Sequence, residues 1–367
     1  DKDGIERVVL NILSNSIKYT EEGGTIKIYV GFVYNDAYIK IIDNGIGIPE
    51  KDLERIFERF YIVDKSRTSK STGLGLAIVK HIVKLFNVDE NIEFTMECNV
   101  ESITEEKLKI MSNYGVNRIS IGVESFNDDI IKKLGRHHNK KMVFDKINLV
   151  KKYFNNINID LIYAAYDDIN ILKDDIMSFL QLNIEHISTY SLILEDNTML
   201  KINGMENINE DVDYEMYKYI ENTLESNGYI HYEISNYARS GYQSKHNLGY
   251  WNNYEYYGFG LSSVSYIGNK RISNTKNLSK YLSGSYLDYV QKENKDIQME
   301  NEVMLGLRKF DGINLDEFEE KFNVLLEDVY DIDDLVRDGY LIKENNYLKI
   351  NKKYMYISNE VIVRMFK

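Results

Sequence analysis

The sequence predicts an α/β protein with three parts: an α+β sandwich fragment, a partial (β/α) barrel and a small, mainly helical, winged-helix-like C-terminal domain. Three observations support this prediction. A helical apolar pattern followed by two alternating strands comes first. Apolar strands then alternate with helical patterns between residues 92 and 192. Acidic helical segments and a short hairpin follow from Glu302 onward.

The composition limits the classes of partner. The 367 residues suffice for two or three cores, because single domains usually have about 100 to 200 residues. The formal net charge of -13 repels phosphate backbones, so no nucleic-acid partner is expected. The sequence shows no signal peptide and no apolar run of the roughly 20 residues that a membrane span needs. We therefore expect no membrane span and a cytoplasmic location.

The first part opens with a predicted helix. From Gly4 to Tyr19 apolar residues recur every three or four positions, and the opposite face is polar. Two strands are predicted at Thr25–Phe32 and Ala37–Asp43, where β-branched and aromatic residues alternate with polar ones. A helix followed by a two-stranded hairpin is the beginning of an α+β layer.

Two glycine-containing motifs follow this hairpin. The motif DNGIGIP runs from Asp43 to Pro49. Gly45 and Gly47 allow the backbone to pass close to a bound base, and the Asp43 carboxylate can accept a hydrogen bond from an exocyclic amine. The motif GLGLAIVK, from Gly73 to Lys80, places two glycines before a helix whose N-terminal amides can bind phosphate.

Four motifs stand in a fixed order: NILSNSIKYT from Asn11 to Thr20, DNGIGIP, ERIFERFY from Glu54 to Tyr61, and GLGLAIVK. Together they resemble the N, G1, F and G2 boxes of the histidine kinases. The resemblance implies binding of Mg-ATP, with Asn15 as the ligand of Mg²⁺. The implied ATP-binding residues are Asn11, Asn15, Lys18, Tyr19, Asp43, Gly45, Gly47, Gly73 and Gly75.

The sequence departs from the kinase pattern at both ends of this segment. Nothing before Asp1 provides a phospho-accepting histidine, and the pattern stops after about Asn87. We therefore expect no autophosphorylation. Phosphotransfer would require a separate phospho-accepting or response-regulator protein.

The second part alternates strands with helices, which is typical of parallel βαβ units. The predicted strands are Ile92–Cys98, Arg118–Val123, Ile157–Tyr163 and His186–Leu192. The predicted helices are Thr104–Asn113, Asp128–Leu134, Lys141–Phe154 and Leu172–Leu182. Glu97, Glu124 and Asp160 fall at or near the C-terminal strand ends, where functional residues of barrels gather.

The sequence from about Val88 to its end resembles the oxygen-independent coproporphyrinogen oxidase family of radical-SAM proteins, and most closely its haem-chaperone branch. The resemblance rests on the motifs MECN, NRISIGVESF, LGRHH, YEISNYAR, HNLGYW and YGFG. It implies that S-adenosylmethionine is contacted by Glu97, Glu124, Arg136 and Asp160.

Two departures from this second family concern its chemistry. Cys98 is the single cysteine, whereas three closely spaced cysteines ligate the 4Fe-4S cluster of the family. We therefore expect no cluster and only vestigial binding of S-adenosylmethionine. Cys98 is expected to be a small buried residue. Glu124 stands where the family has glutamine, which adds a carboxylate beside Glu97 that repels the cofactor's own carboxylate.

Haem is a further candidate ligand. Its candidate contacts are His231, His246, Tyr250 and Trp251, because imidazole can ligate iron and aromatic rings can cover a porphyrin. The alternative is that these residues form a packed, hydrogen-bonded domain junction. In the tail, Gly339 is expected to end a helix before a strand that begins at Tyr340.

We expect three domains: an incomplete kinase-type ATP-binding domain at 1–87, a radical-SAM-like partial barrel with its following region at 88–290, and a C-terminal domain at 291–367. The first interpretation is a fusion of two modules that bind ligands rather than catalyse. A second is residual ATP hydrolysis or phosphotransfer in trans. A third is the joining of fragments of two genes without a function.

Overall fold

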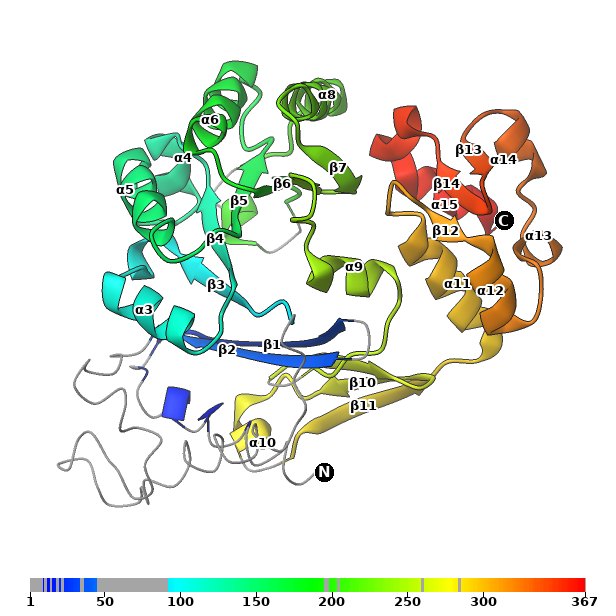
Figure 1. The fold of residues 1–367 in the computed structure, drawn as a ribbon, viewed down its shortest axis with the longest axis horizontal. Coiled ribbons are helices and arrows are strands. Elements are labelled where there is room, and N and C mark those ends of the chain that lie inside the picture. Colours follow the sequence, from blue (N-terminus) through cyan, green and yellow to red (C-terminus); the bar gives the residue numbers. More distant parts are fainter. Residues whose placement is uncertain are drawn as a thin grey trace. The chain divides into compact units, whose positions relative to one another are not determined.

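The computed structural model describes residues 9, 12, 13, 15–17, 20, 23–33, 36–44, 92–194, 198–202, 205–258, 261–282 and 285–366 (Figure 1). The chain divides into two compact units. The first comprises Asp1–Met96, Lys109–Gly115 and Tyr254–Lys292, and the second comprises Glu97–Leu108, Val116–Asn253 and Glu293–Lys367. The boundaries expected after residues 87 and 290 stay predictions.

The first unit contains the expected hairpin, and those residues of the expected helix that the structure describes are helical. Val9, Leu13 and Ser16 are helical and buried, as a single apolar helix face requires. Strand β1 (Ile26–Val33) pairs antiparallel with β2 (Asp36–Asp43). Both predicted strands are therefore confirmed, with bounds that differ by one residue.

A second sheet of the first unit has the strand order β11-β10-β9. Its strands are β9 (Val264–Ile267), β10 (Lys270–Asn274) and β11 (Leu287–Lys292), all antiparallel to their neighbours. The short helix α10 (Leu278–Leu282) precedes β11. Gly268 makes the turn between β9 and β10 with a φ of +60°, a conformation that glycine adopts without steric cost.

The second unit is built on a sheet of six strands in the order β3-β4-β5-β6-β8-β7, and β3 belongs to this unit from Glu97 onward. The bounds are β3 (Thr95–Asn99), β4 (Arg118–Glu124), β5 (Ile157–Tyr163), β6 (His186–Ser191), β7 (Ile230–Glu233) and β8 (Asn236–Ala238). Strands β4, β5 and β6 are parallel, whereas β8 runs antiparallel to β6 and to β7. The parallel part confirms the predicted β/α succession, and the antiparallel hairpin is an addition to it.

Helices α4, α5 and α6 lie outside the parallel strands (Figure 1). The helices of this unit are α4 (Asp128–Lys133), α5 (Lys140–Val150), α6 (Ile169–Leu182), α7 (Met199–Ile202), α8 (Glu210–Ser226) and α9 (Lys245–Trp251), with the 3-10 turn η3 (Val100–Ser102) after β3. Helix α3 (Glu105–Asn113) is divided between the units, and its residues up to Leu108 belong to this one. The start of a helix follows from its capping residue: the side chain of Asp168 accepts a hydrogen bond from the Asn170 amide and begins α6. Ile121, Ile159 and Phe179 are fully buried between strands and helices.

The C-terminal region forms its own core. It contains α11 (Lys295–Gly306), β12 (Ile313–Asn314), α12 (Leu315–Phe322), α13 (Leu326–Val329), α14 (Asp333–Arg337), β13 (Leu341–Glu344), β14 (Tyr347–Ile350), η4 (Lys352–Ile357) and α15 (Ser358–Met365). Val303, Phe318 and Leu348 are buried in its core. The amide of Gly339 donates to Val336 O at 3.0 Å, which confirms Gly339 as the end of a helix.

Among the described residues, none of the helices combines the length and the apolar character that crossing a membrane requires.

Candidate functional site

One face of the six-stranded sheet is polar at its centre. Side chains alternate between the two faces of a strand, so Asn158 and Asp160 of β5 share a face. The register places Ser120 beside Asn158, and Asp160 beside Ser188 of β6. The opposite face carries isoleucine, leucine and valine side chains that are fully buried. The polar face is therefore the one available for a ligand.

The side chains of Glu124 and Arg136 form an ion pair at the end of β4. Arg136 Nη1 also donates to Asn99 Oδ1 at 3.1 Å, so strand β3 holds the guanidinium as well. Glu124 has a φ of +65°, which is uncommon for a residue with a side chain, and such backbone positions concentrate at functional sites. A Cβ at Gly122 would lie 3.1 Å from Glu124 Oε1, so glycine leaves room for this ion pair.

The Asp160 carboxylate lies on the polar face beside two other carboxylates. It accepts hydrogen bonds from Asn158 Nδ2 at 2.9 Å and from Ser120 Oγ at 3.5 Å. Burial raises the pKa of Asp160 to about 6, and the negative charges of Glu97 and Glu124 add to the rise, whereas hydrogen bonds lower it. The structure thus brings together all four residues implied for S-adenosylmethionine. The negative charges of Glu97 and Glu124 lie near enough to raise the pKa of Asp160, and Arg136 forms an ion pair with Glu124.

A directional hydrogen-bond chain leads from helix α9 to Asp160. An ionised Asp160 can only accept hydrogen bonds, so the side-chain nitrogen of Asn158 faces it. The side-chain oxygen of Asn158, Oδ1, therefore faces His186 Nδ1 at 2.6 Å. His186 Nδ1 therefore carries the proton, and His186 Nε2 accepts from Tyr232 OH at 2.7 Å. The amide of Ser244, the capping residue of α9, donates to Tyr232 OH at 3.1 Å. Burial lowers the pKa of His186 well below its ordinary value, so its imidazole stays neutral.

The candidate haem contacts lie in two different surroundings. The ring of His231 is buried and stacks on Tyr237 with a centroid distance of 3.9 Å. Trp251 Nε1 donates to Glu233 Oε2 at 2.9 Å. His231 and Trp251 are therefore packed and hydrogen-bonded, as the junction alternative expects.

His246 differs from these two residues. It is half-buried near the start of α9, and its ring meets that of Tyr250 edge-on with a centroid distance of 4.8 Å. Burial lowers the pKa of His246 to about 4, so its imidazole is neutral at physiological pH. A neutral imidazole is the form that ligates a metal.

Two residues of the expected ATP site lie in the described part of the chain. Asn15 is helical and half-buried, and Asp43 is exposed at the end of β2. The Thr25 amide donates to Asn44 Oδ1 at 2.7 Å, which closes the hairpin next to Asp43. The remaining expected ATP residues, which lie outside the described residues, are Asn11, Lys18, Tyr19, Gly45, Gly47, Gly73 and Gly75.

Sequence reasoning missed several residues of this region and misjudged two. Asn99, Asn158 and His186 were not predicted, although polar residues at alternating strand positions were the available signal. Cys98 is half-buried rather than buried, because it lies near the end of a strand at the edge of the sheet. The carboxylate of Glu124 was expected to repel a ligand's carboxylate, but the guanidinium of Arg136 neutralises it.

Comparisons with known proteins place both parts of the chain. Residues 1–111 match the family described as histidine kinase-, DNA gyrase B-, and HSP90-like ATPase, and residues 294–354 match the HemN C-terminal domain. The heme chaperone HemW of Lactococcus lactis subsp. lactis (strain IL1403) is 37% identical over 280 residues, which cover 73% of this chain and 74% of the relative. HemW of Bacillus subtilis (strain 168) is 33% identical over 282 residues, with coverage of 73% and 74%.

A solved structure agrees in fold. Coproporphyrinogen III oxidase (HemN) from Escherichia coli, described as a radical SAM enzyme, superimposes with a TM-score of 0.66 at 18% identity, covering 80% of this chain and 75% of that one. The chain thus belongs to the family of the heme chaperone HemW, joined at its N-terminal end to a segment of the histidine kinase-type ATPase family.

Proposed function

We propose that this chain is a haem-binding chaperone module whose S-adenosylmethionine site serves binding rather than radical cleavage, and that its N-terminal segment binds Mg-ATP. The single observation that carries the proposed S-adenosylmethionine site is the cluster of Glu97, Glu124, Arg136 and Asp160 at the strand ends. The names of the relatives, heme chaperones, support haem as the cargo.

The chemistry of the cluster suits S-adenosylmethionine. This ligand carries an ammonium group, a sulfonium cation and two ribose hydroxyls, and ionised carboxylates are acceptors for such donors and attract such cations. Asp160 is held in place by Asn158, and Glu124 by Arg136. Two of the carboxylates therefore have fixed orientations before any ligand arrives, which reduces the entropy lost on binding.

The donor set does not fit the iron-sulfur cluster of the radical SAM enzymes. Such a cluster is held by several cysteine thiolates, and Cys98 is the single cysteine of the 367 residues. We therefore derive no radical step for this chain. Binding of S-adenosylmethionine remains compatible with the carboxylates and the guanidinium that are present.

The test of the S-adenosylmethionine site is calorimetric titration of the intact chain with S-adenosylmethionine. The expected result is binding that Asp160→Asn weakens at least about tenfold, because one charged hydrogen bond is worth about 1.5 to 3 kcal/mol. The matched control is Asp129→Asn, which removes an exposed carboxylate from α4. Equal affinities of Asp160→Asn and the unchanged chain would refute the assignment.

For haem we propose His246 as the axial ligand and Tyr250 as a ring that covers the porphyrin. The half-buried position of His246 and its neutral imidazole support this role. The intact chain is titrated with haemin, and the Soret band is followed. His246→Ala should shift the band and weaken binding, whereas His137→Ala, which removes an exposed imidazole, should change neither. An unchanged band in His246→Ala would exclude this ligand.

For the N-terminal segment we propose binding of Mg-ATP, supported by the family match of residues 1–111. Asp43→Ala should abolish binding in a calorimetric titration with Mg-ATP, whereas Asp36→Ala, at the opposite end of β2, should leave it intact. ATP consumption that Asn15→Ala abolishes would favour the second interpretation, residual ATP hydrolysis or phosphotransfer in trans. No consumption above background would leave binding as the role of this segment.

A further inference from the structure

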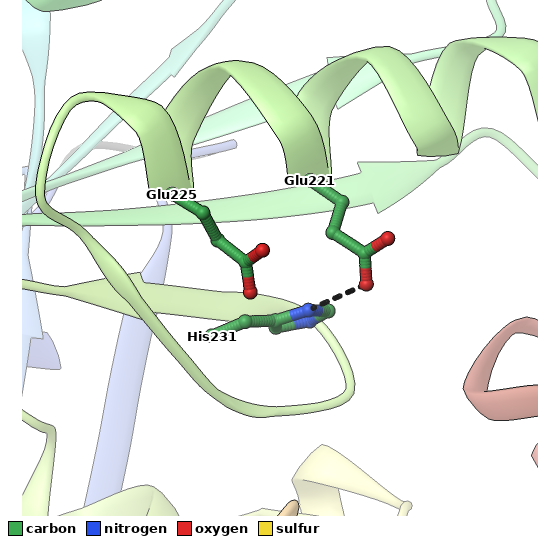
Figure 2. A group of neighbouring side chains, drawn as sticks. All are labelled: Glu221, Glu225 and His231. Atoms are coloured by element: carbon green, nitrogen blue, oxygen red, sulfur yellow. Dashed lines mark ion pairs between the residues drawn. The ribbon is translucent and has the colours of Figure 1, made fainter. Parts of the chain in front are cut away.

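Two carboxylates and an imidazole meet beneath helix α8, away from the cluster at the strand ends. Glu221 and Glu225 are four residues apart on α8 and share one face of the helix. His231 comes from β7, and both carboxylates point toward its ring (Figure 2). One ligand atom from each of the three residues lies within 4.8 Å of the other two.

Two of these ligand atoms are buried and lack a hydrogen bond. The side chains of His231 and Glu221 are 0% and 1% exposed, and His231 Nδ1 lies 3.7 Å from Glu221 Oε1. Within the described part of the chain neither atom makes a hydrogen bond, and their separation exceeds the usual range of about 2.7 to 3.2 Å. Two ligands of one tetrahedral zinc ion, each bonded at about 2.0 to 2.1 Å, lie about 3.4 Å apart. The separation of His231 Nδ1 and Glu221 Oε1 is thus closer to that of two ligands of one metal ion than to a hydrogen-bond distance.

Two lysines supply the positive charge that now faces these carboxylates. Lys352 Nζ lies 2.5 Å from Glu225 Oε2 and 4.0 Å from Glu221 Oε1. Lys218 pairs with the other oxygen of Glu221. The side chain of Lys352 is 49% exposed, so its ammonium can move into solvent while Lys218 stays and keeps the local charge balanced. Another cation can therefore replace the Lys352 ammonium between the two carboxylates.

We propose that Glu221, Glu225 and His231 form a binding site for a divalent transition-metal ion of the zinc class, and that the ammonium of Lys352 takes its place when the metal is absent. Imidazole and carboxylate donors suit zinc and its neighbours, whereas an all-oxygen set would favour magnesium or calcium. The His231 ring is fixed by its stacking on Tyr237, as a preorganised ligand requires. A bound ion would tie α8 to β7 and leave a fourth position for water.

Titration of the intact chain with Co²⁺ tests this site, after chelator treatment and dialysis. Co²⁺ reports a tetrahedral site by its visible absorption, and Zn²⁺ affinity follows from competition with a chromophoric chelator. We expect one equivalent to bind, and His231→Gln and Glu221→Gln to weaken binding at least about tenfold. Lys352→Met should strengthen binding several-fold, because it removes the competing cation and retains all three ligands.

Two variants serve as controls. His137→Gln removes an exposed imidazole and Glu215→Gln removes an exposed carboxylate of α8, so both should bind Co²⁺ as the unchanged chain does. Circular dichroism checks that each variant folds. If His231→Gln does not fold, Glu225→Gln replaces it, since that side chain is 34% exposed and the same loss is expected. Absence of binding in both the unchanged chain and Lys352→Met would overturn the proposal, as would binding that none of the three ligand substitutions weakens.

Discussion

Replacing Asp160 by asparagine should stabilise the second unit while it weakens ligand binding. Burial of the charged group raises the pKa of Asp160 from 3.8 to about 6. A rise of this size corresponds to about 3 kcal/mol of lost folding free energy at pH 7, since each pKa unit is worth about 1.4 kcal/mol. Because the side chain is only partly buried, we expect the gain in Asp160→Asn to be about 1 to 2 kcal/mol.

The gain depends on pH in a defined direction. Below pH 3.8 the carboxyl is protonated in the folded and the unfolded chain, so Asp160 carries no penalty there. Between this value and about 6 the folded state binds the proton more tightly, and stability falls as the pH rises. The full penalty applies above pH 6. The stabilisation by Asp160→Asn should therefore be present at pH 7.5 and vanish near pH 4.

The assay is urea unfolding followed by the fluorescence of Trp251. This residue is the single tryptophan of the chain and belongs to the second unit, so the signal reports on that unit. Unfolding of Asp160→Asn and of the unchanged chain is compared at both pH values. A lower stability of the variant at pH 7.5, or a gain that is the same at both pH values, would refute the argument from burial of charge.

Three further substitutions have expected effects on stability. Arg136→Met leaves the carboxylate of Glu124, which is 7% exposed, without its ion-pair partner. The free energy of unfolding in the same urea assay should fall by about 1 to 3 kcal/mol, and an unchanged value would contradict the pairing. Phe179→Ala empties a fully buried site and should cost about 3 to 5 kcal/mol, and a cost below about 1 kcal/mol would contradict that burial. Gly312→Ala would place a Cβ 2.2 Å from Leu348 O at a residue whose φ is +76°. The midpoint of thermal unfolding, followed by circular dichroism, should therefore be clearly lower, and an unchanged midpoint would disprove the close approach.

The elements with strong local patterns were predictable from the sequence. Strand β5 was predicted with its observed bounds, because isoleucines and leucine alternate with polar residues from Ile157 to Leu161 and the apolar run continues to Tyr163. The hairpin of β7 and β8 was missed. Its strands have four and three residues, which is too short for an alternation to be recognised. Their pairing with β6 depends on tertiary contacts rather than on local pattern.

The residues of the candidate site were predictable as a group, but their partners were not. Glu97, Glu124 and Asp160 could be placed together because strand ends of a parallel sheet meet at one edge. The contacts of Asn99 with Arg136 and of Asn158 with His186 join residues 37 and 28 positions apart. Such contacts follow from the strand register and the path of a loop, which no local pattern specifies.

The charged partners of Glu124 and Asp160 could be identified only from the structure. Both are carboxylates on neighbouring strands, yet Glu124 has a guanidinium partner, whereas the charged side chains that act on Asp160 are carboxylates. Removing the partner of the first should therefore lower stability, and neutralising the second should raise it. If both substitutions shift stability in the same direction, one common property such as packing governs the cluster. Opposite shifts would mean that Asp160 is kept ionised at a cost to folding, which is the trade expected where a buried charge serves a ligand.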